Sequence, residues 1–106
     1  MKKIDSVEEF TDILKTKQKF LLIKHSTTCP ISKAAFNEYE AFVSENKGIP
    51  TFYLFVQDAR PLSNYIAETF NIRHESPQAL LFDQGIVTWN VSHWKITRKS
   101  LNEATS

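Results

Sequence analysis

Apolar and polar residues alternate between helix-like and strand-like spacing along the chain. Ser6 with Glu9 three residues later forms a capping-box pattern, and the apolar residues that follow at helical spacing predict a helix over about 6–16. The continuous apolar segment that starts at Phe20 predicts a short strand over about 20–24, covered on both faces. This first part of the chain is therefore expected to form a helix and then a buried strand.

The remainder of the chain continues the same alternation. One apolar side over about 30–45 predicts a second helix, and the apolar, β-branched segment 51–56 predicts the strongest strand of the chain. A third helix is expected at about 62–70. Segments 77–82 and 86–90, joined by a short connection that contains glycine, predict a hairpin, and a last helix is expected at about 93–104.

This order of elements predicts an α/β fold. Because a helix joins the first two strands, they should be parallel with a right-handed crossover, and the hairpin should add an antiparallel pair. We therefore expect a central mixed four-stranded sheet flanked by helices on both faces. At 106 residues, the chain has the size of one domain with one core, covering 1–106.

Charge and composition restrict the possible functions. The net charge of +1 and the absence of a basic stripe argue against nucleic acid as a partner. No apolar stretch approaches the roughly 18 residues needed to span a bilayer, and the N-terminal segment lacks a signal-peptide core. A single cysteine is typical of a protein of the reducing cytoplasm. We expect a cytoplasmic protein without membrane contact, and a monomer because no segment indicates an interface.

The only cysteine, Cys29, follows the first predicted strand and directly precedes Pro30. Proline is well tolerated at the first position of a helix, so Cys29 should lie at or next to the helix N-cap. Unpaired N–H groups and the helix dipole there favour a thiolate, which is the nucleophilic form of cysteine. Ser32 stands where a dithiol redox protein has its second cysteine. The segment therefore predicts a one-thiol version of a Cys-x-x-Cys site.

Two simpler interpretations stand beside this one. Cys29 is a structural thiol if it is buried, because free cysteines are among the most buried residues, although its polar neighbours argue against this. Ser32 either donates a hydrogen bond to the sulfur or is an ordinary residue of the first helical turn. The histidines are too scattered to form a compact ligand set, so no metal is expected: His25, His74 and His93.

The order of elements, with Cys29 after the first main strand and Ser76-Pro77 before the hairpin, resembles the thioredoxin-like superfamily over nearly the whole chain. That resemblance implies a cis Pro77 opposite the catalytic cysteine. Thr28-Cys29-Pro30-Ile31-Ser32 and Glu75-Ser76-Pro77-Gln78 are similar, more narrowly, to the monothiol bacilliredoxins of the YtxJ type, also called bacilliredoxin C.

The resemblance implies a thiol–disulfide oxidoreductase that removes bacillithiol, a low-molecular-weight thiol, from S-bacillithiolated proteins through a mixed disulfide on Cys29. It implies bacillithiol as co-substrate, no bound cofactor, and an indirect dependence on a bacillithiol disulfide reductase. Thr28, Pro30 and Ser32 would support the site, and the backbone of Ser76 with Pro77 would bind the substrate in an extended conformation. Three neighbouring side chains could add positive potential: Lys24, His25 and Lys33.

Other functions remain open from the residues alone. A glutaredoxin-like reductase that uses another low-molecular-weight thiol would need the same sulfur chemistry. A non-catalytic thioredoxin-like module would use the groove between Cys29 and Pro77 to hold partner segments. An iron–sulfur carrier is a further alternative, but the chain lacks the Cys-Gly-Phe-Ser motif of such monothiol glutaredoxins.

Overall fold

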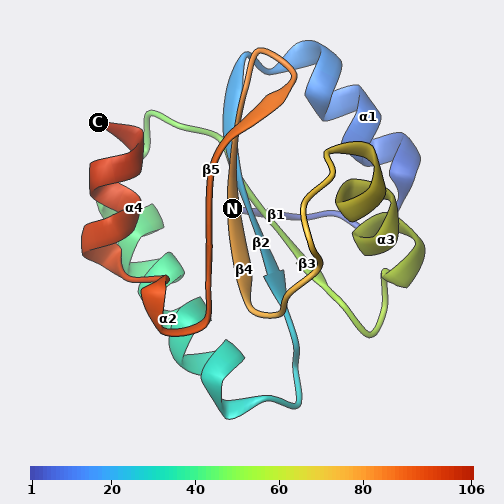
Figure 1. Ribbon diagram of the computed structural model, residues 1–106. Helices are drawn as coiled ribbons and strands as arrows, with labels where there is room; N and C mark the ends of the chain where they lie inside the picture. Colours follow the sequence, from blue (N-terminus) through green and yellow to red (C-terminus); the bar gives the residue numbers. More distant parts are fainter.

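A five-stranded mixed sheet with helices on both faces forms the centre of the molecule, in a computed structural model that describes residues 1–106 (Figure 1). The strand order is β1-β3-β2-β4-β5. The strands are β1 (Lys2–Lys3), β2 (Lys19–His25), β3 (Thr51–Phe55), β4 (Gln78–Asp83) and β5 (Ile86–Ser92). The helices are α1 (Val7–Thr16), α2 (Pro30–Glu45), α3 (Arg60–Thr69), the 3-10 helix η1 (His93–Lys95) and α4 (Arg98–Thr105).

Strand β2 is central to the sheet. It pairs parallel with β3, with Leu22 opposite Phe52, and antiparallel with β4, with Leu22 opposite Leu80. Side chains of β2 alternate between the two faces, as the pleat of a strand requires. Because both faces are covered, every residue of β2 from Phe20 to His25 is buried, as the continuous apolar pattern predicted.

Two apolar cores lie on the two faces of the sheet. Helices α1 and α3 cover one face, and α2 and α4 cover the other (Figure 1). On the α1 side, the Phe20 and Phe82 rings stack with centroids 4.7 Å apart, and Phe10 meets Phe82 edge-on at 5.4 Å. On the α2 side, Tyr39 is fully buried and its hydroxyl donates to the Phe52 carbonyl at 2.9 Å. These cores fix α2, and with it the position of Cys29, against the sheet.

The expected α/β architecture with helices on both faces is confirmed, but the sheet has five strands rather than the expected four. The additional strand β1 pairs parallel with β3, with Lys2 opposite Phe52. Two lysines in a row have no apolar alternation, so hydrophobic patterning had no means of identifying this strand. None of the helices combines the length and the hydropathy needed to cross a membrane.

The last predicted helix is two elements. η1 ends at Lys95, and α4 begins after Thr97, whose hydroxyl accepts the N–H of Ser100 in a capping box. His93 has a positive φ of 55°, so the continuous helix expected over 93–104 is wrong in its first part. The predicted hairpin is confirmed, and its two turn residues Gln84 and Gly85 have positive φ, as two-residue hairpin turns require.

Candidate functional site

Cys29 is the N-cap residue of α2. Strand β2 ends at His25, the loop Ser26–Thr28 follows, and Cys29 has extended backbone angles before Pro30 starts the helix. The Cys29 N–H donates to the Ser26 carbonyl at 3.3 Å, and the Cys29 carbonyl accepts the N–H of Lys33 at 3.1 Å. The thiol is free and half-buried. The sequence-based position of Cys29 at the helix start is therefore correct.

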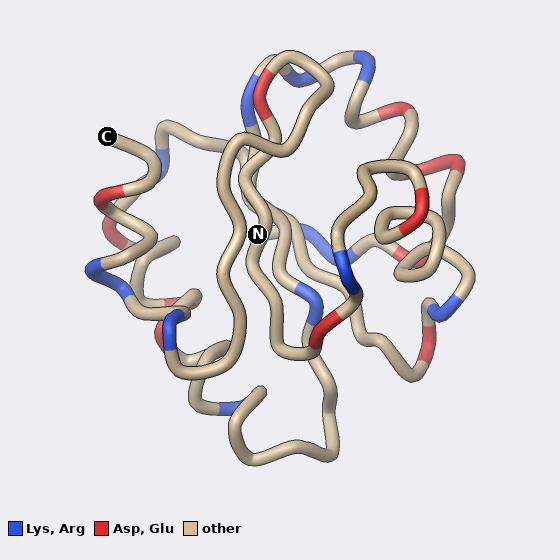
Figure 2. The backbone as a smooth tube through the Cα atoms, in the orientation of Figure 1, with Lys and Arg blue, Asp and Glu red and all other residues tan.

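The surroundings of Cys29 favour its ionised form. The backbone N–H of Ser32 lowers the pKa of the Cys29 thiol, the N–H of Ile31 and the Ser32 hydroxyl lower it further, and burial opposes them. The Cys29 side chain makes no capping hydrogen bond, so the N–H groups of the first turn have no side-chain acceptor and favour the thiolate by their proximity. Figure 2 shows that the loop between Lys24 and Lys33 carries no charged residue, so no carboxylate within the loop opposes a thiolate.

Ser32 is fully buried beneath the loop that precedes Cys29. Its Oγ accepts the backbone N–H of Ser26 at 3.2 Å, which ties the start of the loop to the first turn of α2. A hydroxyl that accepts one hydrogen bond still has its own proton to donate. The arrangement therefore leaves the Ser32 O–H free to point at a sulfur at the N-cap.

Gln57, just after β3, holds the same loop from the other side. Its Oε1 accepts the N–H of Thr27 at 3.3 Å, and its Nε2 donates to Ser26 Oγ at 2.8 Å and to Thr28 Oγ1 at 3.2 Å. Thr28 and Pro30, both expected near the site, are exposed on either side of Cys29. Sequence analysis missed Gln57, because a single exposed glutamine after a strand carries no pattern that distinguishes it.

Ser76 and Pro77 lie at the carboxyl end of β2, from which the Cys29 loop leaves. The register places Lys24 opposite Gln78, the residue that follows Pro77. The Ser76-Pro77 bond is cis and Pro77 is buried. Ser76 Oγ is buried without a hydrogen-bond partner.

The segment after β5 adds a further element beside Pro77. The N–H of His93 donates to the Pro77 carbonyl at 3.0 Å. The next residue, Trp94, is 70% exposed. Trp94 is therefore a large apolar side chain left in solvent, one residue after the backbone contact between His93 and Pro77.

Lys24 does not point toward Cys29, in contrast to the expectation that it adds positive potential there. Its side chain is fully buried on the α3 face, where Nζ donates to the Ser63 carbonyl at 3.0 Å and lies 3.3 Å from His74 Nδ1. Burial lowers the pKa of Lys24 to about 8. The lysine thus ties the segment that leads to Ser76 to helix α3.

His25 and Lys33 lie on the α2 side. The His25 ring packs 4.5 Å from the Phe36 ring and 5.6 Å from the Phe55 ring. Burial lowers the pKa of His25, so the neutral ring is favoured and adds no full charge near the sulfur. Lys33 is exposed in the first turn of α2 and is the one residue of the expected cationic group that keeps an exposed charge there.

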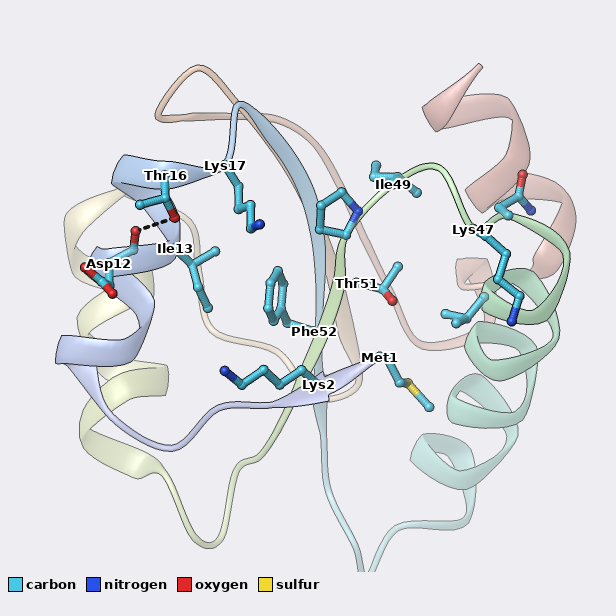
Figure 3. Close-up of a pocket in the computed structure, with 13 residues that line it drawn as sticks. Met1, Lys2, Asp12, Ile13, Thr16, Lys17, Lys47, Ile49, Thr51 and Phe52 are labelled. Carbon is cyan, nitrogen blue, oxygen red and sulfur yellow. Dashed lines mark hydrogen bonds between the residues drawn. The ribbon is translucent and has the colours of Figure 1, made fainter.

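The largest cleft lies at the opposite end of the sheet. It has a volume of about 670 Å³ and is open at the amino ends of β2 and β3, between α1 and α2 (Figure 3). Lys2, Lys17 and Lys47 line it with Asp12, and no cysteine does. No group of three or more His, Cys, Asp or Glu side chains is placed to hold a metal ion. Thiol chemistry therefore belongs to the Cys29 end, because Cys29 is the single cysteine of the chain.

Comparison with known proteins agrees with this geometry. The family model described as monothiol bacilliredoxin BrxC matches residues 2–101. A solved structure provisionally described as an oxidoreductase with a thioredoxin fold is 38% identical, with a TM-score of 0.92, and the match covers 98% of this chain and 92% of that one.

More distant matches show the fold alone. A thioredoxin from Fasciola hepatica has a TM-score of 0.79 at 11% identity, covering 98% of this chain and 95% of the other. A mitochondrial thioredoxin from Saccharomyces cerevisiae has a TM-score of 0.77 at 14% identity, covering 98% and 92%. The fold is thus that of thioredoxin, while the sequence similarity is to bacilliredoxins.

Proposed function

Because this chain belongs to the monothiol bacilliredoxin family, we propose that it is a thiol–disulfide oxidoreductase that removes bacillithiol from S-bacillithiolated proteins. The observation that carries the proposal is the single free cysteine at the open start of α2, where backbone N–H groups lower its pKa. A thiolate with access to solvent is what disulfide exchange requires.

In the first step, the Cys29 thiolate attacks the bacillithiol sulfur of the mixed disulfide. A bond forms between Cys29 Sγ and that sulfur, and the bond between bacillithiol and the substrate protein breaks. The substrate cysteine leaves as a thiolate and takes a proton from solvent. Since the chain has no second cysteine, Cys29 keeps the bacillithiol at the end of this step.

In the second step, a free bacillithiol thiolate attacks the bacillithiol sulfur held by Cys29. The products are bacillithiol disulfide and the regenerated Cys29 thiolate. Overall, one free bacillithiol is oxidised and pairs with the bacillithiol released from the mixed disulfide, while the protein cysteine is reduced. A bacillithiol disulfide reductase would restore the co-substrate, so that enzyme is an indirect partner.

The neighbouring residues would orient the two sulfurs. The N–H and hydroxyl groups of Ser32 would stabilise the Cys29 thiolate. The backbone of Ser76, beside Pro77, would pair with an extended segment of the substrate protein, a common mode of peptide recognition. Thr28 and Pro30 would border the opening on either side of the sulfur. A lone free thiol suits the reducing cytoplasm, where we propose that the protein works as a monomer.

Intact-mass spectrometry tests the proposal. The reduced protein is mixed with a model protein that carries bacillithiol on its one cysteine, and the same model protein carrying glutathione is the comparison. The expected result is a gain of one bacillithiol on Cys29 with release of the bare model protein, and no gain in the Cys29→Ser variant.

Two outcomes would contradict this proposal. A bare Cys29 beside a persisting mixed disulfide would remove the oxidoreductase assignment for this substrate and favour a groove-binding module. Faster transfer from the glutathione adduct than from the bacillithiol adduct would instead support a glutaredoxin-like reductase.

A further inference from the structure

Gln57 contacts the reactive loop with both ends of its carboxamide, although it lies about thirty residues away in the sequence. The oxygen accepts from the backbone of Thr27, and the nitrogen donates to the hydroxyls of Ser26 and Thr28. All three residues between β2 and Cys29 are therefore bonded to one side chain. No other side chain from outside the loop and α2 makes a hydrogen bond to them.

The base of Gln57 is itself fixed. The N–H of Val56 donates to the His25 carbonyl at 2.8 Å, which joins the last residue of β2 to the residue before Gln57. Val56 is buried, and the N–H of Asp58 donates to the Phe55 carbonyl at 3.0 Å. The carboxamide thus extends from a rigid turn, and the loop bonds to it as to a fixed support.

The loop has one other side-chain anchor, Ser32 Oγ, which accepts the Ser26 N–H from the α2 side. Gln57 and Ser32 therefore hold the loop from opposite sides. The backbone of this loop sets the direction in which the Cys29 side chain leaves the chain, and so its distance from the N–H groups of the first turn. A sulfur displaced from those groups would lose part of their stabilisation.

We propose that Gln57 is a positioning residue, which fixes the loop Ser26–Thr28 and thereby holds Cys29 at the open start of α2. It makes no hydrogen bond to the sulfur, and it acts through the loop. For its effect on turnover, the inference rests on the proposed exchange reaction. Its effect on the thiol itself is independent of which disulfide is the substrate.

The test compares Gln57→Ala with Gln18→Ala. Gln18 is an equally exposed glutamine in the connection before β2, at the other end of that strand, and its side chain makes no hydrogen bond. The rate of Cys29 alkylation by a small haloacetamide is measured against pH. Gln57→Ala is expected to raise the midpoint and to lower the rate at neutral pH about fivefold, the factor for one net hydrogen bond. Gln18→Ala is expected to match the parent protein.

A double-mutant cycle identifies the route of the effect. If Gln57 acts through the loop hydroxyls, Gln57→Ala should change the rate less in a Ser26→Ala, Thr28→Val background than in the parent protein. Gln57→Glu provides a second variant, because a carboxylate accepts from Thr27 and from both hydroxyls and so retains the loop geometry. It should raise the alkylation midpoint through its charge while the maximal rate at high pH stays at the parent value.

An unchanged alkylation profile in Gln57→Ala would overturn the inference. Full additivity in the cycle would overturn the route through the hydroxyls and leave the Thr27 N–H as the contact that carries the effect. De-bacillithiolation by the same variants separates the two proposals. If the parent protein fails to remove bacillithiol but Gln57→Ala still shifts the alkylation midpoint, the proposed function fails and the positioning role stands. If the parent protein removes bacillithiol but Gln57→Ala does not shift the alkylation midpoint, the proposed function stands and the positioning role fails.

Discussion

Helices α1 and α2 begin in different ways, although both have an extended N-cap residue. At the start of α1, Ser6 Oγ accepts the N–H of Glu9 at 3.1 Å, and the Glu9 carboxylate accepts the N–H of Asp5 at 3.0 Å. At the start of α2, Cys29 occupies the same place, but its side chain caps nothing. Serine and cysteine differ only in having oxygen or sulfur in the side chain. The first-turn N–H groups of α1 nevertheless have a side-chain acceptor, whereas those of α2 have none.

The difference separates a structural helix end from a reactive one. Backbone N–H groups lower the pKa of both acids: the N–H of Asp5 is hydrogen-bonded to the Glu9 carboxylate, and the N–H of Ser32 lowers the pKa of Cys29 although the thiol forms no cap. Glu9 is ionised throughout the neutral range, so its charge serves the cap alone. A lowered pKa gives Cys29 a larger thiolate fraction below its ordinary pKa, and that charge is available as a nucleophile.

Among changes at the two helix starts, replacing the Cys29 sulfur should have the largest effect on activity. Cys29→Ser should abolish thiol transfer completely, because a hydroxyl at this position is not ionised at neutral pH. The same change should leave the thermal midpoint within a few degrees, since serine is a favoured N-cap residue. Turnover assays with circular dichroism as a folding control would check this, and measurable transfer by the variant would contradict the mechanism.

Ser32→Ala removes a hydroxyl from the first turn of α2 and leaves Cys29 in place. The pKa of Cys29 should rise, and kcat/KM should fall about tenfold, since hydrogen bonds to charged groups contribute about 1.5–3 kcal/mol. The N–H of Ser26 also loses its acceptor in this variant. The pH dependence of Cys29 alkylation measures the first effect. An unchanged midpoint would mean that Ser32 is an ordinary residue of the helical turn.

Ser6→Ala removes the side-chain cap at the start of α1, where Ser6 Oγ accepts the N–H of Glu9. Loss of this N-cap should lower the free energy of unfolding by about 1 kcal/mol, measured by urea denaturation. Cys29 alkylation and turnover should stay at the parent values, because α1 covers the opposite face of the sheet. A parallel loss of thiol reactivity would show that the two helix ends are not independent.

The smallest effect should appear in the pH dependence of stability. The ordinary pKa values of Cys29 and Glu9 are 9.0 and 4.5, and both are lowered in the folded state. The stabilisation from Glu9 should be lost as the pH falls below about 4.5. The stabilisation from the Cys29 thiolate should grow as the pH rises toward 9.0.

Unfolding curves of the parent protein, Glu9→Gln and Cys29→Ser across pH would measure these two contributions. Glu9→Gln should reduce the pH dependence of stability on the acidic side, and Cys29→Ser should reduce it on the alkaline side. Neither variant should change the other side of the profile. A Cys29→Ser profile that follows that of the parent protein at alkaline pH would argue against a stabilised thiolate.

The position of Cys29 at the start of α2 was predictable from the sequence, but the contacts that hold its loop in place were not. A lone cysteine before Pro30 placed the thiol at the N-cap, because proline and the apolar pattern locate a helix start well. Ser32 was named, although its role was left open. Gln57 and the inward turn of Lys24 depend on contacts between distant segments, which local patterns do not contain.

The sheet shows the same limit. The apolar segments that form β2 to β4 indicated the fold class, since strands covered on both faces have continuous apolar sequences. The edge strand β5, which alternates exposed and half-buried residues, was expected from its hairpin connection. Strand β1 exists only because β3 offers an edge to Lys2–Lys3. The break between η1 and α4 depends on the positive φ of His93 and the cap at Thr97, which compete with a helical pattern that continues through them.

The central claim is that the open start of α2 holds Cys29 as a thiolate. The most direct measurement is the pH dependence of Cys29 alkylation in the folded protein and in the same protein unfolded in urea. The account predicts a lower midpoint in the folded protein than in the unfolded chain. Coincident midpoints, or a higher midpoint in the folded state, would contradict it.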